Sequence, residues 1–370
     1  MFTELPLSAQ TAFAQANDAA LAADLSRSVA SLRGSFAKKT VKGGTYWYFQ
    51  HQDEVSGQRR QLYVGPDSEQ VRALMGEARS VPADALGPLA RAALALGCAG
   101  LPRRQFLVIE RLADYRFFRA GGVLIGTHAF LACGNLLGVR WGDSDRTEDV
   151  DFAHLGKSLA IALPADIDVD THRAIESLAA GFLPVGLLDG RIGASYRNPK
   201  EPEFRLDFLT TLHRGGDKAF EHPKLGVVMQ PLPFLEFILE GVAQTTLLSD
   251  NGAVVVNVPA PARYALHKLI VYARRASRPK SGKDLAQAAA LLACLRERRA
   301  WEVEEAWADL IARGPTWRAS ARRGLEALDR VAPELHVSAW LDRDRAGTRV
   351  ARAGRTSDTP SAGGRKRSGR

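Results

Sequence analysis

Cysteine and long apolar runs are scarce in this chain, and each shortage excludes a class of protein. The three cysteines, Cys98, Cys133 and Cys294, are scattered without C-x-x-C spacing, so the sequence predicts neither a disulfide framework nor a zinc site. No apolar run approaches the length that spans a bilayer, so we expect no membrane partner. The first residues carry Glu4 and no basic region, which argues against a signal peptide. A reducing cytoplasm is the predicted location.

Excess positive charge is also scarce outside one short segment, although the net charge is +9. Residues 343–370 hold nine Lys or Arg against two Asp, which leaves only +2 for the preceding 342 residues. This tail is rich in Gly, Ser and Arg, and we expect it to be disordered. It could touch polyanions by counterion release or simply be solvated. Most of the apparent signal for nucleic-acid binding therefore lies in the tail.

The most informative stretch comprises residues 121–152. Its end, Asp149-Val150-Asp151-Phe152, places two carboxylates at positions i and i+2, which point to the same side of a strand. At that separation the carboxylates repel by about 3 kcal/mol at an effective dielectric constant near 20, so a cation would offset the cost. Mg²⁺, which prefers oxygen ligands, suits such a pair. The alternative is a solvated strand end without metal, and the nearby pair Asp143 and Asp145 is predicted to form a turn.

Two further features belong with this acidic pair. Before it, a short apolar strand ends in Gly126-Thr127 and leads into a helix, whose free backbone N–H groups favour a phosphate. After it, residues 203–209 alternate so that Asp207 lies on one face of a strand and its apolar neighbours lie on the other. A buried carboxylate there needs a partner, either a metal ion or an arginine such as Arg205.

Gly-Thr at a helix start, followed by Arg-Thr-x-Asp-Val-Asp and a later Asp, resembles the DNA polymerase β-type nucleotidyltransferase superfamily. It is most similar to the bacterial branch related to AbiE-type toxins, and a Lys…Arg…Lys-Asp arrangement at residues 268–284 adds to the resemblance. The resemblance implies an enzyme that moves an NMP group from an NTP to a hydroxyl of RNA or tRNA, a protein or a small molecule. The resemblance is compatible with toxin-like activity, and the sequence leaves open whether an antitoxin partner exists.

Site residues follow from the same resemblance. Two Mg²⁺ ions would bridge the triphosphate and be bound by three catalytic carboxylates, Asp149, Asp151 and Asp207. The nucleotide would be held by Gly126, Thr127, Arg146, Lys268, Lys283 and Asp284.

The predicted fold is α+β, with a mixed β-sheet nucleotidyltransferase core at residues 101–260. Residues 1–100 are expected to form helices and a β-hairpin, residues 261–342 a helical bundle, and residues 343–370 the basic tail. Lysines and arginines lie among Tyr46, Trp47 and Tyr48 of the hairpin, a pattern that either binds nucleic acid or packs on neighbouring helices. Two other functions therefore stay open: a non-catalytic nucleotide or nucleic-acid-binding protein, and a Mg²⁺-dependent phosphohydrolase.

Overall fold

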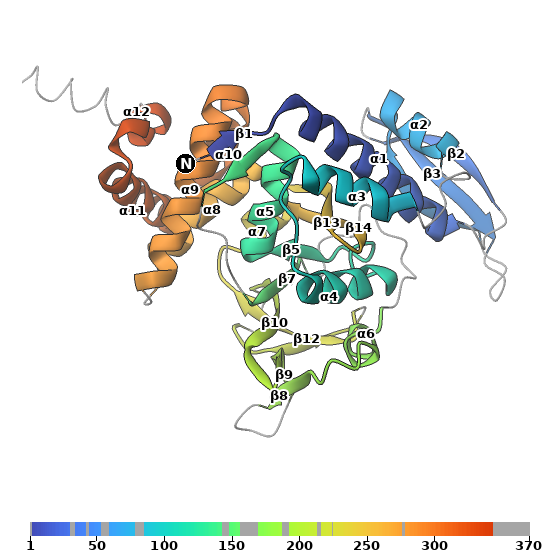
Figure 1. Ribbon diagram of the computed structural model, residues 1–370. Helices are drawn as coiled ribbons and strands as arrows, with labels where there is room; N and C mark the ends of the chain where they lie inside the picture. Colours follow the sequence, from blue (N-terminus) through green and yellow to red (C-terminus); the bar gives the residue numbers. More distant parts are fainter. Residues whose placement is uncertain are drawn as a thin grey trace, which may run out of the picture.

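The computed structural model describes residues 2–29, 34–41, 44–52, 59–77, 85–142, 148–155, 169–186, 192–212, 216–223, 225–275 and 278–342. Some sequence predictions lie outside these residues, namely the turn at Asp143 and Asp145 and the basic tail. Figure 1 shows a central sheet, a small N-terminal sheet at one end of the molecule and the C-terminal helices at the other.

A mixed seven-stranded sheet forms the centre of the molecule. Its strands are β5 (Val123–Ile125), β7 (Val150–His154), β8 (Leu183–Gly186), β9 (Ile192–Asn198), β10 (Glu201–Thr211), β11 (Phe220–His222) and β12 (Val227–Leu232). The order is β11-β12-β10-β7-β5, with β9 also paired to β10 and β8 to β9. Strand β10 is parallel to β7 and β12, and the other pairs are antiparallel. The predicted α+β class with a mixed sheet is confirmed.

Aromatic side chains on one face of β10 attach it to its neighbours. Leu206 and Phe208 are fully buried and alternate with Arg205 and Asp207, which point to the other face. The Phe208 ring stacks on Phe152 of β7 with 5.3 Å between centroids. A register shift by one residue would turn these apolar side chains toward solvent, so the buried face specifies how β7 and β10 align.

Four helices accompany the central strands: α4 (Arg103–Asp114), α5 (Gly126–Leu137), α6 (Thr171–Ser177) and the short α7 (Glu236–Leu239). Helix α4 ends at Asp114, and Arg116 takes a left-handed conformation with φ of 65°. A left-handed residue cannot continue a right-handed helix. Helix α6 starts after Asp170, whose side chain accepts a 2.8 Å hydrogen bond from the backbone N–H of Arg173.

The N-terminal residues form helices and a three-stranded sheet, one strand more than the hairpin that the sequence predicted. The elements are β1 (Phe2–Glu4), α1 (Leu7–Val29), β2 (Gly34–Val41), β3 (Gly44–Gln52), β4 (Arg59–Pro66), α2 (Glu69–Glu77) and α3 (Leu86–Ala95). Residues 34–41 pair along the length of β3, as at Phe36 and Phe49, whose rings also meet edge to face. Strand β1 pairs with β6 (Val139–Trp141), so the first residues contact the core.

Lysines cover two aromatic rings of the N-terminal sheet. Lys38 lies over the Trp47 ring at 5.0 Å, and Lys39 lies over Tyr48 at 5.6 Å. Asp67 accepts 2.8 Å hydrogen bonds from both Lys38 Nζ and Trp47 Nε1. These contacts lie within the sheet and its adjoining turn, so the choice between packing on helices and nucleic-acid binding stays a prediction.

A second hairpin is formed by β13 (Val242–Ser249) and β14 (Gly252–Pro259). Its residues Leu248, Ala253 and Val255 pack with apolar side chains of α1 and α3. The C-terminal helices are α8 (Pro261–Tyr272), α9 (Arg278–Arg298), α10 (Ala300–Ala312), α11 (Pro315–Val331) and α12 (Val337–Leu341), with a 3₁₀ turn at Pro333–Leu335. None of the described helices combines the length and apolar character that crossing a bilayer requires. The division into four domains stays a prediction.

Candidate active site

Two carboxylates meet at the middle of the central sheet. Asp151 of β7 and Asp207 of β10 are direct register partners on parallel strands. Neighbouring strands lie roughly 4.8 Å apart, so the two side chains stand side by side. Asp149 lies two residues before Asp151, next to the same face. The structure therefore pairs Asp151 with Asp207 and places Asp149 just before β7, whereas the catalytic roles of the three residues stay predictions.

Burial and neighbouring charge make the ionised form of Asp151 costly. Burial is the larger cause and raises the pKa of its carboxyl to about 6, and the charges of Asp207 and Asp149 add to the effect. Lys268 and Arg275 act in the opposite direction and lower it. A nearby cation would therefore stabilise the ionised form of Asp151, which burial and the neighbouring carboxylates disfavour.

Different partners hold the other two carboxylates. Arg205 binds Asp149 with both ends of its guanidinium, from Nε to Oδ1 at 3.0 Å and from Nη2 to Oδ2 at 2.6 Å. Ser195 of β9 donates its hydroxyl to Asp207 Oδ1. The sequence left open an ion pair between Arg205 and Asp207, but the direct partner of Arg205 is Asp149. Sequence reasoning missed Ser195, which is paired with Asp207 across strands that only the fold aligns.

Gly126 closes the site on the β5 side. Ile125 pairs with Asp151 across β5 and β7, and α5 begins at the next residue. Gly126 has φ of 67°, and a Cβ at this position would lie 2.1 Å from Asp151 Oδ2. Only glycine can place the backbone this close to the carboxylate in this conformation. No side chain caps the N-terminus of α5, which leaves its first N–H groups for another acceptor.

We predict that Gly126→Ala damages both stability and any activity of the site. The left-handed conformation costs alanine about 1–2 kcal/mol, and the Cβ would push against Asp151 Oδ2. Urea unfolding should show that the free energy of unfolding falls by about 2 kcal/mol or more. Gly186→Ala is a suitable control because a Cβ there meets nothing within 4 Å. Equal stability of the two variants would contradict this role of Gly126.

Two of the predicted nucleotide-binding residues of the C-terminal helices, Lys268 and Asp284, form a buried ion pair, which the exposed Arg275 joins. Lys268 of α8 donates to Asp284 Oδ1 of α9 at 2.8 Å, and Arg275 Nε lies 2.9 Å from Asp284 Oδ2. Lys268 also lies over the ring of Tyr264 at 5.2 Å. Because two cations share one carboxylate, the cluster keeps a net positive charge, and both cations influence Asp151. Lys283 precedes Asp284 and is partly buried.

Two residues that the sequence analysis did not assign to the site join it in the structure. Tyr264 donates its hydroxyl to the carbonyl of Gly126, which connects α8 to the glycine turn. His128 is 2% exposed, and its pKa is lowered to about 4, first by burial and then by Lys283. Thr127 is also buried. The remaining predicted residue, Arg146, lies outside the described residues.

The donor chemistry of the site fits a divalent cation that prefers oxygen. Asp151 and Asp207 offer carboxylate oxygens from adjacent strands, which is the ligand type that Mg²⁺ takes. Within the described ranges, however, no three Asp, Glu, His or Cys side chains are gathered closely enough to hold a metal ion. The bond to Arg205 holds the Asp149 carboxylate, so binding by all three would require that carboxylate to turn.

Comparison with known proteins identifies the class. Residues 103–313, more than half of the chain, match a family model described as Nucleotidyltransferase. The chain therefore belongs to this nucleotidyltransferase family. Its matched region contains both strands that carry Asp151 and Asp207.

One solved structure is similar, the crystal structure of an antigenic nucleotidyltransferase-like protein from Paracoccidioides brasiliensis. It shares 17% sequence identity and a TM-score of 0.29, and the match covers 61% of this chain and 95% of that one. The search of curated proteins found no match for the chain.

Proposed function

We propose that this protein transfers an NMP group from an NTP to a hydroxyl acceptor in a Mg²⁺-dependent reaction. The observation that carries the proposal is the pairing of Asp151 with Asp207 on parallel strands, beside the glycine turn that starts α5. Carboxylates and free helix N–H groups complement a metal ion and a phosphate, respectively. The family match supports the same class of reaction.

Each group has a separate task in this proposal. Asp149, Asp151 and Asp207 would hold up to two Mg²⁺ ions, which when bound supply charge stabilisation at the attacking and leaving oxygens. Ser195 orients the carboxylate of Asp207 by its hydrogen bond. The backbone of Gly126 and Thr127 binds phosphate through the uncapped N-terminus of α5.

Lys268 and Arg275 contribute fixed positive charge in this proposal. Both lower the pKa of Asp151, so their field reaches the carboxylates. The same field favours the negative charge of a triphosphate and of a pyrophosphate leaving group. Asp284 keeps the two cations in place from α9.

The direct test supplies each of four NTPs, labelled in the α-phosphate, with Mg²⁺ and total RNA or the protein alone. We expect label to move to an acceptor and pyrophosphate to be released. Free phosphate without transfer would instead indicate the phosphohydrolase. Chelation of Mg²⁺ should stop the reaction, and transfer that continues in a chelator would contradict the metal-dependent proposal.

One observation favours a second candidate, a nucleotide or nucleic-acid-binding protein without turnover. Arg205 occupies both oxygens of Asp149, an arrangement that stabilises the site without metal. This candidate predicts nucleotide affinity with no label transfer. Arg205→Ala separates the two candidates, since releasing Asp149 should strengthen Mg²⁺ binding only if the carboxylates form a metal site.

We also propose, as the finer assignment, a relationship to AbiE-type toxins with RNA, tRNA or a protein as acceptor. Its support is the joint position of Lys268 and Asp284, which the sequence motif placed in one group. A toxin-like protein should arrest growth when expressed, and Asp151→Asn should abolish the arrest. Growth arrest by the Asp151→Asn variant would exclude a toxic nucleotidyl transfer, and an antitoxin partner would be sought only after that control.

A further inference from the structure

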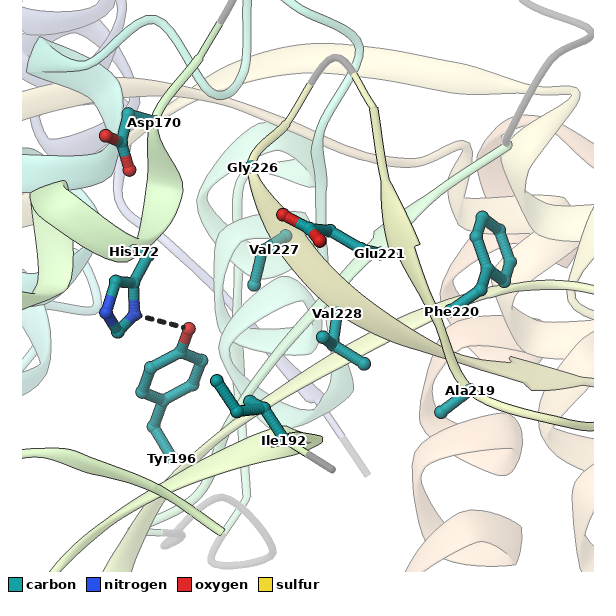
Figure 2. Close-up of a pocket in the computed structure, with 10 residues that line it drawn as sticks. All are labelled: Asp170, His172, Ile192, Tyr196, Ala219, Phe220, Glu221, Gly226, Val227 and Val228. Atoms are coloured by element: carbon teal, nitrogen blue, oxygen red, sulfur yellow. Dashed lines mark hydrogen bonds between the residues drawn. The ribbon is translucent and has the colours of Figure 1, made fainter. Parts of the chain in front are cut away.

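A cavity of about 670 Å³ opens in the central sheet away from the paired carboxylates. It lies among α6, β9, β11 and β12, and its lining residues are drawn in Figure 2. The volume falls within the roughly 300–1,000 Å³ that small-molecule sites occupy. No residue of the candidate active site lines it.

The cavity lies where one edge of β10 changes its partner. Strand β9 pairs with β10 as far as Asp207, and β12 takes over from Leu209. Ile192 and Tyr196 of β9 and Val227 and Val228 of β12 line the cavity at this point.

The polar groups of the cavity are acceptors. His172 Nε2 lies 3.1 Å from Glu176 Oε1, and its Nδ1 lies 3.0 Å from the hydroxyl of Tyr196. In the neutral form of His172 that donates from Nε2 to the Glu176 carboxylate, Nδ1 accepts the Tyr196 proton, and the Tyr196 oxygen then offers its lone pairs to a ligand (Figure 2).

Two carboxylates add negative charge to these acceptors. Asp170 and Glu221 both line the cavity, and Figure 2 shows the Glu221 carboxylate directed toward its His172 side. Burial, followed by the charges of Glu176, Asp170 and Glu221, raises the pKa of Tyr196 to about 12. No lysine or arginine is found among the described lining residues. A ligand with N–H donors and positive charge would satisfy all of these groups.

Apolar side chains form the rest of the wall. Val227 is buried, Phe220 and Val228 are partly buried, and Ile192 is 51% exposed. Methylene groups of a ligand would cover these surfaces and remove them from water.

We propose that this cavity binds a small alkyl polyamine, with ammonium groups at Glu221, Asp170 and Tyr196 and methylene groups against Ile192 and Val228. The site is separate from the candidate active site because Ser195, which bonds to Asp207, and Tyr196 point to opposite faces of β9. The proposal does not depend on nucleotidyl transfer.

The test is isothermal titration calorimetry of the full chain with spermidine at about 150 mM salt, which screens exposed charges. Glu221→Gln and Asp170→Asn should each weaken binding by about 10-fold, since each removes one ammonium partner. Asparagine at position 170 can still cap α6, so the second variant should stay folded. Diacetylated spermidine, which has the same chain and fewer charges, should bind more weakly than spermidine.

Two controls locate the site. Glu203→Gln removes an exposed carboxylate of β10 that does not line the cavity, and Asp207→Asn removes a carboxylate of the candidate active site. Both should bind spermidine as the wild type does. A Kd above about 1 mM, unchanged affinity in Glu221→Gln, or loss of binding in Asp207→Asn would each overturn the proposal.

Discussion

Asp151→Asn and Asp207→Asn should each reduce nucleotidyl transfer by about 10³-fold or more. Each substitution keeps the shape of the side chain and removes one of the two charges that the register of β7 and β10 places together. Asparagine at position 207 can still accept the Ser195 hydroxyl, so the loss reports charge rather than a collapsed hydrogen bond. The measurement is the initial rate of label transfer from the preferred NTP at saturating Mg²⁺.

The double variant distinguishes a joint site from two independent contributions. If the two carboxylates act as a unit, Asp151→Asn/Asp207→Asn should lose little more activity than either single variant. Asp250→Asn, in the exposed turn between β13 and β14, is a control of the same chemistry. Residual activity within about 10-fold of the wild type in either single variant would be incompatible with the proposed site.

Asp151→Asn should at the same time stabilise the protein at alkaline pH. The folded pKa of Asp151 is raised to about 6, whereas the unfolded value is about 3.9. The folded state therefore binds this proton more tightly than the unfolded state does. The stabilisation that protonated Asp151 contributes is fully present below about pH 3.9 and is lost as the pH rises through about 6. Relative to asparagine, the wild type should be less stable by about 3 kcal/mol at pH 8 and by about half of that at pH 5.

Urea unfolding of both proteins between pH 5 and pH 8 without Mg²⁺ measures this difference. Because each comparison is made at one pH, titration of the other groups cancels to first order. If the difference in the free energy of unfolding between the two proteins does not depend on pH, Asp151 does not have the raised pKa. Addition of Mg²⁺ should then raise the melting temperature of the wild type and leave that of Asp151→Asn nearly unchanged, since only a ligand that binds the folded state stabilises it.

Local patterns in the sequence were sufficient to predict which face of a strand each site side chain occupies. The alternation of residues around Asp207 predicted that its carboxylate lies on one face of the strand and that Leu206 and Phe208 lie on the other face. The structure has this arrangement. Parity within a strand is a local property, because successive side chains alternate whatever the fold. The Gly126 turn was found for a similar reason, since a short strand, a glycine and a helix follow one another along the chain.

Pairings between distant segments could not be obtained in this way. Arg205 and Asp207 share a face of β10, so a local argument favours their ion pair, but the parallel register sets Arg205 beside Asp149. Arg205 could therefore be assigned to Asp149 only after the alignment of β7 with β10 was known. The Lys…Arg…Lys-Asp motif likewise put Lys268 and Asp284 in one group, whereas the contact between Lys268 and Arg275 through Asp284 depends on how α8 packs on α9.

The strand that carries Arg205 and Asp207 is hydrogen-bonded along both edges. Asp207 itself has a strand partner on each side, Asp151 and Ser195. Opening this part of the chain to solvent requires several strands to separate together, so amide deuterium uptake at residues 206–210 should follow global unfolding. The proposed chemistry would then rest on the slowest-exchanging segment of the fold, and substrate access would have to come from motions elsewhere.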